Sequence, residues 1–236
     1  MTVTAGGIFA PGPLTGTGTL TLSNSLTTAS GARLQFALGT NSDLTAVTGT
    51  MSLGGTLNIT NAGGFGVGTY TLFTYTGALT TIGLTLGTTP DASLVYTFDT
   101  NTAGRVKLVV QYTPFVAWQV QHFGSATLPQ AQPDADPDGD HLLNAEEYLA
   151  GTNPKLSSSV LAITDTQCLT SNGFSVSWQS VSGKTYRVAY TPALTSPWLT
   201  NLPNSILTST GQTTLIYVDQ TINTDTNRFY RINLVP

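Results

Sequence analysis

Aspartates recur at every second position from Asp134 to Asp140, and two glutamates follow at Glu146 and Glu147. Six of the twelve acidic residues of the chain lie in this stretch. Carboxylates at alternate positions, followed by a more distant bidentate acid, are the oxygen ligands of a 12-residue calcium loop. A loop that starts at Asp134 would put Ala145 at the twelfth position, where no side-chain ligand is available, so we reject that register.

A loop that starts at Asp136 places an oxygen at every ligand position. Side chains serve positions one, three, five, nine and twelve, and a backbone carbonyl serves position seven. Oxygen ligands without thiols or clustered imidazoles favour Ca²⁺ over zinc or copper. The predicted metal ligands are Asp136, Asp138, Asp140, the Leu142 carbonyl, Asn144 and Glu147.

This run resembles the calcium loops of EF-hands, dockerins and thrombospondin type 3 repeats. One residue departs from their pattern: His141 stands at the sixth position, where glycine is expected. A histidine in the left-handed conformation costs on the order of 1 kcal/mol. The alternative to a calcium site is a solvated acidic linker. Because there is one loop and not a pair, we expect a structural role for the ion and not a regulatory one.

Outside the loop, few groups could carry out acid–base catalysis. The two histidines have no neighbouring nucleophile signature, and isolated charges on strands are more often solvated or paired than catalytic. We therefore expect no enzymatic activity, and a fragment of a β-helical carbohydrate-active enzyme is kept only as an alternative. The residues weighed for catalysis are His122, His141, Asp91, Asp99, Arg105 and Lys107.

The overall composition predicts a mainly β protein that works outside a cell. Of 236 residues, 40% are apolar, only 8% are charged and 24 are glycine. Eight Lys and Arg residues without a cluster, with a net charge of −4, disfavour nucleic-acid partners. No run approaches the roughly 18 apolar residues of a membrane-spanning helix.

The first half, residues 1–112, holds 18 of the glycines and short strand patterns between turns. A local echo, in which Gly18-Thr-Leu-Thr-Leu-Ser returns as Gly55-Thr-Leu-Asn-Ile-Thr and again from Gly68, suggests a solenoid. The expected strands are 19–22, 34–38, 56–60, 69–73, 94–98 and 106–110.

The stretch from Leu34 through Leu53-Gly-Gly-Thr-Leu-Asn-Ile-Thr to Gly68-Thr-Tyr-Thr-Leu-Phe-Thr-Tyr resembles the autotransporter-associated β-strand repeat of bacterial surface proteins. This resemblance covers nearly half of the chain. It implies an extracellular, right-handed β-helix of the kind found in autotransporter passengers. The last residues, Phe229 to Pro236, are too few for the outer-membrane barrel of such proteins.

Residues 113–157 should form a helical linker around the calcium loop. A helix begins at Thr113-Pro114-Phe115 and ends near Gly124, and a second covers Leu143 to Ala150. Residues 158–236 return to strand patterns, expected at 160–164, 174–178, 186–190, 215–218 and 229–234, which indicate a small antiparallel sandwich. The run from Phe174 to Tyr190 is similar to the central strands of fibronectin type III domains, which implies a spacer or binding module.

Single residues in the last domain carry further expectations. Cys168, the only cysteine, is expected to be a small buried side chain. Trp178 should lie in the core, whereas Trp198 is the aromatic residue most suited to an exposed contact. A glycan-binding surface would need exposed aromatic groups near Trp198 and Tyr217.

These features together predict an extracellular bacterial structural protein that assembles into a fibre or surface layer and is stabilised by calcium. An adhesin or carbohydrate-binding module of a larger secreted protein is the alternative. Residues 2–9 are short, uncharged and prone to form strands, which suits addition of this segment to a second copy. The expected partners are other copies of the chain, with a glycan or cell-surface partner as a further option.

Overall fold

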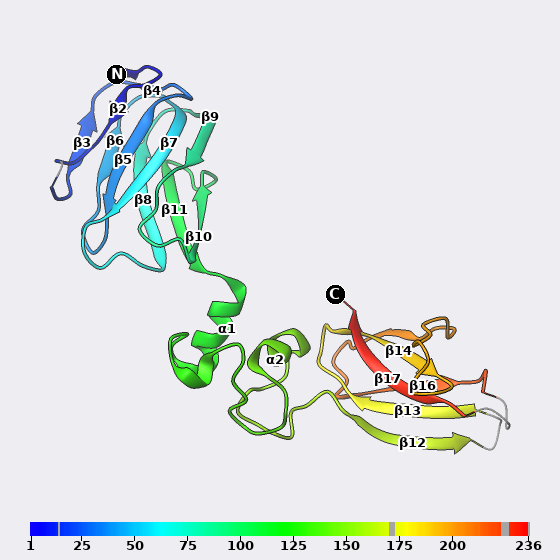
Figure 1. Ribbon diagram of the computed structural model, residues 1–236. Helices are drawn as coiled ribbons and strands as arrows, with labels where there is room; N and C mark the ends of the chain where they lie inside the picture. Colours follow the sequence, from blue (N-terminus) through cyan, green and yellow to red (C-terminus); the bar gives the residue numbers. More distant parts are fainter. Residues whose placement is uncertain (14, 170–172, 223–226, 236) are drawn as a thin grey trace. The chain divides into compact units, whose positions relative to one another are not determined.

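Apolar residues that alternate with Thr or Ser form strands in both halves of the chain, as the sequence predicts. The structure, a computed structural model, describes residues 1–13, 15–169, 173–222 and 227–235. It divides into unit 1, Met1–Pro114, and unit 2, Phe115–Pro236. The fold is mainly β, with a β-solenoid of about three turns, additional sheets and short helices (Figure 1).

Unit 1 contains two sheets. One has the strand order β1-β4-β7-β5-β2, with β9 also paired to β7, and the other has the order β10-β11-β8-β6-β3. The strands are β1 (Thr2–Val3), β2 (Ile8–Phe9), β3 (Thr19–Leu22), β4 (Leu26–Thr28), β5 (Arg33–Leu38), β6 (Leu44–Val47), β7 (Met51–Asn61), β8 (Gly68–Tyr75), β9 (Leu79–Leu86), β10 (Leu94–Asp99) and β11 (Arg105–Tyr112).

Successive coils of unit 1 stack in parallel. Thr2 pairs with Thr27 and Thr27 pairs with Ser52, so equivalent residues lie 25 positions apart. The second sheet repeats this spacing where Leu20 pairs with Thr45. The coils end in the antiparallel hairpin of β10 and β11, whose second strand pairs with β8. The predicted solenoid is therefore present, and every strand expected in residues 1–112 is confirmed within a few residues.

The interior of unit 1 is built from inward-facing side chains of both sheets. Phe9, Phe36 and Phe73 are almost fully buried, and their ring centroids lie 5.2 to 6.4 Å apart. Burial of each such ring stabilises the fold by up to about 3 kcal/mol. The stack joins the first, second and third coils, which makes it the centre of the solenoid.

The sequence echo that suggested the solenoid does not follow its coils. Gly18 directly precedes β3 and Gly68 opens β8, both in the second sheet, whereas Gly55 lies inside β7 of the first sheet. The repeating unit of the fold is the coil of about 25 residues, which sequence echoes alone do not reveal.

Unit 2 begins with the predicted helices and continues as six strands in two three-stranded sheets. One sheet has the order β12-β13-β16 and the other β15-β14-β17. The elements are α1 (Pro114–Phe123), the 3₁₀ turn η1 (Pro129–Ala131), α2 (Asn144–Ala150), β12 (Ile163–Leu169), β13 (Gly173–Gln179), β14 (Thr185–Thr191), β15 (Ile206–Thr208), β16 (Thr214–Asp219) and β17 (Phe229–Val235).

A shared core holds these two sheets together as a β-sandwich. Trp178 and Tyr217 from one sheet pack with Tyr186 and Val188 from the other, and all four are buried. The expected core position of Trp178 is thereby confirmed. The predicted strand at 160–164 is shifted, because the edge strand begins at Ile163.

One expectation for unit 2 is wrong, and one requirement of a glycan-binding surface is not met at Tyr217. Cys168 is exposed, because its strand β12 lies at the edge of its sheet and pairs on one side with β13. Tyr217 is 6% exposed and donates its hydroxyl hydrogen to the Pro203 carbonyl, so it offers no stacking platform. Trp198 is half-buried beneath the Arg231 guanidinium, 4.5 Å from its ring centroid.

Candidate metal centre

Short elements before the acidic loop fix its position. Gln119 of α1 is buried and donates through Nε2 to the Ala131 carbonyl of η1 at 2.6 Å. Asn144, the first residue of α2, donates through Nδ2 to the carbonyls of Gln130 at 2.9 Å and Gln132 at 2.7 Å. The amide of Asn144 thus fastens the end of the loop to the turn that precedes it.

The aspartates shape the loop through its backbone. Asp136 accepts hydrogen bonds from the N–H groups of Gly139 at 2.9 Å and His141 at 3.0 Å. Asp138 accepts one from Asp140 N–H at 3.3 Å, and Asp140 accepts one from the N–H of the next residue but one, at 2.8 Å. These bonds turn the three side chains inward, so that carboxylate oxygens of Asp136, Asp138 and Asp140 lie within 4.8 Å of one another.

The backbone at the sixth position has the conformation that a calcium loop needs. His141 has a φ of 75°, in the left-handed region, although its residue type disfavours that region. The hydrogen bond from its N–H to Asp136 helps to hold this conformation. His141 thus adopts the left-handed conformation in which glycine is expected at this position, at a cost on the order of 1 kcal/mol.

Several buried oxygens around the loop lack a hydrogen-bond donor among the described residues. They are Oδ2 of Asp138, Oδ2 of Asp140, Oε2 of Glu147 and Oδ1 of Asn144. Buried polar atoms in folded proteins are nearly always satisfied, and a buried carboxylate without a partner is costly. A cation that binds these oxygens would remove that cost, so the residues fit the predicted ion.

Glu147 is the carboxylate whose surroundings most clearly favour a bound cation. Its side chain is fully buried, and Oε1 accepts a hydrogen bond from the Thr152 hydroxyl at 3.2 Å. Burial is the main cause that raises the pKa of Glu147 to about 7; the charges of Asp138, Asp140 and Asp136 add to it, and the Thr152 hydrogen bond opposes it. Without a cation, this carboxylate tends to bind a proton at neutral pH.

The structure brings some of the predicted ligands together more closely than others. Asp136, Asp138 and Asp140 form one group, while Glu147 lies outside the 4.8 Å limit of that group. Asn144 uses its amide nitrogen to hold the loop and keeps its oxygen without a donor. Hard oxygen atoms from carboxylates, an amide and a backbone carbonyl are the donor set that Ca²⁺ prefers.

The second helix connects the loop to the sandwich. Gly151 ends α2 with a φ of 77° and donates its N–H to the Glu147 carbonyl at 2.6 Å. Lys184, beside β14, donates from Nζ to the Leu149 carbonyl at 2.6 Å. Glu147 and the Leu149 carbonyl, which contacts the sandwich through Lys184, therefore belong to the same short helix.

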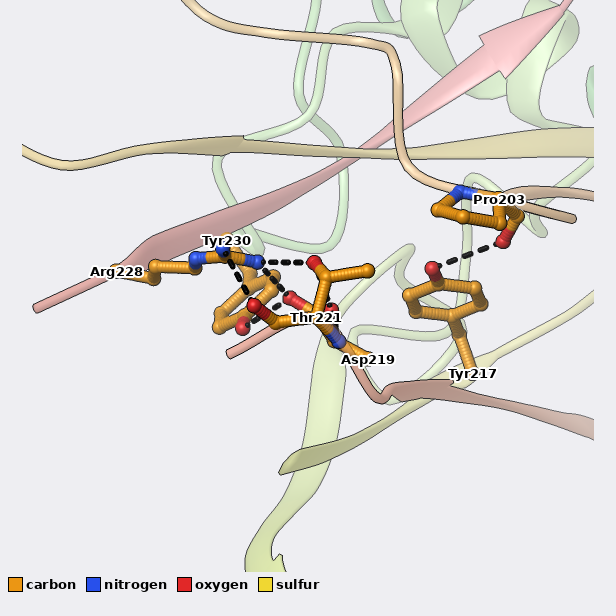
Figure 2. Close-up of polar contacts among 6 residues, drawn as sticks. All are labelled: Pro203, Tyr217, Asp219, Thr221, Arg228 and Tyr230. Atoms are coloured by element: carbon orange, nitrogen blue, oxygen red, sulfur yellow. Dashed lines mark hydrogen bonds and ion pairs between the residues drawn. The ribbon is translucent and has the colours of Figure 1, made fainter. Parts of the chain in front are cut away.

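A second polar cluster lies at one end of the sandwich, and the sequence analysis missed it (Figure 2). Asp219 of β16 is fully buried and accepts hydrogen bonds from Tyr230 at 2.8 Å and from Thr221 at 2.7 and 2.8 Å. Arg228 forms an ion pair with the same carboxylate and stacks over the Tyr190 ring at 4.4 Å. The alternation of Asp219 with inward-facing residues of β16 was the available signal that its side chain points to the core.

Burial by itself raises the pKa of Asp219, but hydrogen bonds from Thr221, Tyr230 and Arg228 outweigh it and lower the pKa below its usual value. All the donors satisfy a single carboxylate that connects β16 with the start of β17. This arrangement stabilises a charge and offers no obvious site for a reaction.

The carboxylates considered for catalysis, Asp91 and Asp99, accept hydrogen bonds within the turns in which they lie. Asp91 accepts hydrogen bonds from the N–H and hydroxyl of Ser93, which lower its pKa. Asp99 accepts three from Asn101 and Thr102 and lies 3.7 Å from Lys107. The Thr102 hydroxyl is the largest cause of the lowered pKa of Asp99. These contacts explain both residues as turn formers.

Within the ranges that the structure describes, no helix has the length and hydrophobicity needed to cross a bilayer.

Comparisons with known proteins give one relevant similarity. The chain is 38% identical over 125 residues to the adhesin BmaC autotransporter of Brucella suis biovar 1 (strain 1330), which covers 49% of this chain and 4% of that protein. The chain thus spans only a small fraction of the length of this relative. No protein-family model matches the chain, and no solved structure matches it. The similarity and the parallel coils of unit 1 fit an autotransporter β-helix repeat.

Proposed function

We propose that the chain is a non-catalytic module of a bacterial cell-surface protein with an adhesin-like role, in which bound calcium stiffens the segment between a β-helix and a β-sandwich. The β-helix and the similarity to an autotransporter adhesin support the surface role. The observation that carries the calcium part is the fully buried, unpartnered oxygen of Glu147 beside three grouped aspartates.

Calcium would act here as a structural clamp. Four carboxylates repel one another, and in the described part of the chain no Lys or Arg forms an ion pair with any of them. A bound dication offsets that repulsion and fixes Glu147, and with it the start and the middle of α2. Because Lys184 holds the other end of α2, the clamp would extend from the acidic loop into the sandwich.

Retention of coated beads tests the adhesin-like role. Beads that carry the full chain are passed over cultured epithelial cells in calcium buffer and in chelator, beside beads that carry albumin. We expect more beads with the full chain to be retained in calcium, and fewer in chelator or with Glu147→Gln. The Asp134→Asn variant is the matched control, because Asp134 lies outside the proposed ligand set. Equal retention of chain-coated and albumin-coated beads would refute the adhesin-like role.

Head-to-tail association of copies is a second candidate, and the sheet topology favours it. The strands β3 and β10 lie at opposite edges of one sheet. β3 runs parallel to β6 and β8. Two antiparallel pairings, β8 with β11 and β11 with β10, bring β10 back to the same direction as β3. In the other sheet, the outer strand β9 contains no charged residue, and neither do residues 2–9. Uncharged edges of this kind are prone to pair with further strands.

Residues 2–9 would not leave their own subunit to become a strand of a second copy. Thr2–Val3 and Ile8–Phe9 pair with β4 and β5 of their own chain, and Val3 and Phe9 are buried. Their outer backbone edge would therefore contact a second copy while the segment stays in its own sheet. Deletion of residues 1–10 would remove core side chains and is not a clean test.

Substitution of an exposed edge residue is a better test of association. Ile8 is 59% exposed, and Ile8→Lys places a charge on the edge without loss of a core side chain. In light scattering over a concentration series, the average molar mass of the wild type should increase with concentration, whereas that of Ile8→Lys should stay at the value of a monomer. Ile216→Lys, at a 58% exposed position of unit 2, should behave like the wild type. A wild-type chain that remains monomeric throughout would exclude association.

A further inference from the structure

A cavity with a mixed polar and apolar lining lies on the outer face of the first sheet of unit 1. It has a volume of about 490 Å³, within the range of small-molecule sites. Its floor is formed by outward-facing side chains of β5 and β7, and the segment Ala10–Pro13 after β2 lines it too. The residues used below are Arg33, Gln35, Asn58, Thr60 and Asp43.

Arg33 gives the cavity its chemical character. It is one of only three basic residues in residues 1–112. Its backbone N–H donates to the Gly7 carbonyl, whereas its guanidinium has no hydrogen-bond or ion-pair partner among the residues that the structure covers. A guanidinium with free donors is suited to bidentate binding of a carboxylate.

Neutral polar groups line the same cavity as this cation. Gln35 is the cross-strand neighbour of Asn58, and Thr60 lies two residues further along β7. Asn58 accepts hydrogen bonds from the N–H and hydroxyl of Thr88 at 3.0 and 3.1 Å, which orient its amide. Amides and hydroxyls beside one cation match the hydroxyl groups and the single carboxylate of an acidic sugar.

Asp43 borders the cavity but is committed to its wall. It is 3% exposed, and its two oxygens accept hydrogen bonds from the N–H groups of Gly18 at 2.7 Å and Ala37 at 2.8 Å. A Cβ atom on Gly12 would come within 2.1 Å of Asp43 Oδ1, so the segment that lines the cavity packs closely on this carboxylate. Asp43 thus holds the wall, and its negative charge is partly offset by the two N–H groups.

We propose that this cavity binds a carboxylated sugar unit of an acidic glycan, with Arg33 as the ligand of the carboxylate and Gln35 and Thr60 as ligands of hydroxyl groups. The proposal rests on the adhesin-like role and names the chemistry that it would recognise. The absence of an exposed aromatic ring among the residues that line the cavity is the reason for preferring a charged sugar over a neutral one.

Binding of tri-galacturonate to the full chain, measured by isothermal titration calorimetry, tests this site. The wild type should bind tri-galacturonate in its acid form and should not bind its methyl ester. Arg33→Gln should weaken binding by about tenfold or more, since it removes a charge-assisted hydrogen-bond pair. Arg105→Gln, at another exposed arginine of unit 1, should leave affinity unchanged.

Each outcome has a distinct meaning. Failure of the wild type to bind tri-galacturonate, or equal loss in Arg33→Gln and Arg105→Gln, would overturn the proposed site. Binding of the methyl ester as tightly as the acid would overturn the role of the carboxylate. If the beads adhere to cells although tri-galacturonate does not bind, the adhesin-like role stands and this site fails. If tri-galacturonate binds and the beads do not adhere, the site stands without the adhesin-like role.

Discussion

The buried carboxylate of Asp219 pairs with the guanidinium of Arg228, and together they join the end of β16 to the approach to β17. The side chain of Asp219 is fully buried, and that of Arg228 is 12% exposed. Tyr230 and Thr221 complete the hydrogen bonds of the carboxylate. In a buried ion pair of this kind, desolvation offsets much of the attraction while the pair is whole, but loss of one member leaves a charge buried without a partner.

We predict that Asp219→Asn lowers the free energy of unfolding of unit 2 by about 3 kcal/mol. Urea unfolding followed by tryptophan fluorescence measures this, because Trp118, Trp178 and Trp198 all lie in unit 2. Asp165→Asn is the control, since Asp165 is exposed on β12. Equal stability of the two variants would show that the Asp219 cluster does not stabilise the sandwich.

The same cluster predicts a dependence of stability on pH. The pKa of Asp219 is lowered in the folded state, so its contribution is complete above the unfolded-state pKa of about 3.9 and is lost as pH falls through the folded-state pKa. The urea midpoint of the wild type should fall over this acidic range, and that of Asp219→Asn should fall less. Parallel pH profiles for the two proteins would contradict the assignment.

In unit 1, the stacked phenylalanines should be the most sensitive point. Phe73→Ala should cost about 3 to 5 kcal/mol, because it leaves a cavity beside the rings of Phe9 and Phe36. Hydrogen exchange should show lost protection in β5, β7 and β8. Ile82→Ala, at a 42% exposed position on β9, serves as the control and should leave this protection intact. Unchanged exchange in Phe73→Ala would mean that the stack is not central to the solenoid.

Substitutions of Asn144 and Glu147 should change the stability of the protein differently in calcium and in chelator. Asn144→Ala leaves two carbonyls without their donor and should cost about 1 to 3 kcal/mol even in chelator, with a further cost in calcium because Oδ1 of Asn144 is a proposed ligand. Glu147→Gln should alter stability chiefly in calcium. Thermal unfolding of both variants in calcium and in chelator separates these effects, with exposed Asn201→Ala as the reference. An equal cost of Asn144→Ala in calcium and in chelator would contradict its proposed ligand role, and no cost in chelator would contradict the structural role of its amide nitrogen.

Local patterns predicted much of this fold. Alternation located the strands of residues 1–112, the Gly124 and Gly151 signals located both helix ends, and ligand spacing selected the loop that starts at Asp136. All of these depend on residues close together in the chain. The short strands β4 and β6 were missed, and so was the longer β9 (Leu79–Leu86), whose apolar residues do not keep a single alternation.

Pairing between distant segments could not be predicted in the same way. The coil spacing depends on which strands meet, and the exposure of Cys168 depends on which strand lies at the edge of a sheet. The Asp219 cluster joins residues of β16 to others near β17, and nothing in either segment alone identifies the partner. The cavity at Arg33 likewise arises only when β5 and β7 pair and the segment after β2 packs beside them.

Calorimetric titration of the chelator-treated full chain with calcium tests the central claim most directly. We predict binding of one ion with a dissociation constant on the order of 10⁻⁵ to 10⁻³ M. Glu147→Gln should weaken binding most among single changes at the proposed ligands, and Asp134→Asn should bind as the wild type does. No calcium binding by the wild type, or equal affinity in the wild type and Glu147→Gln, would contradict the account.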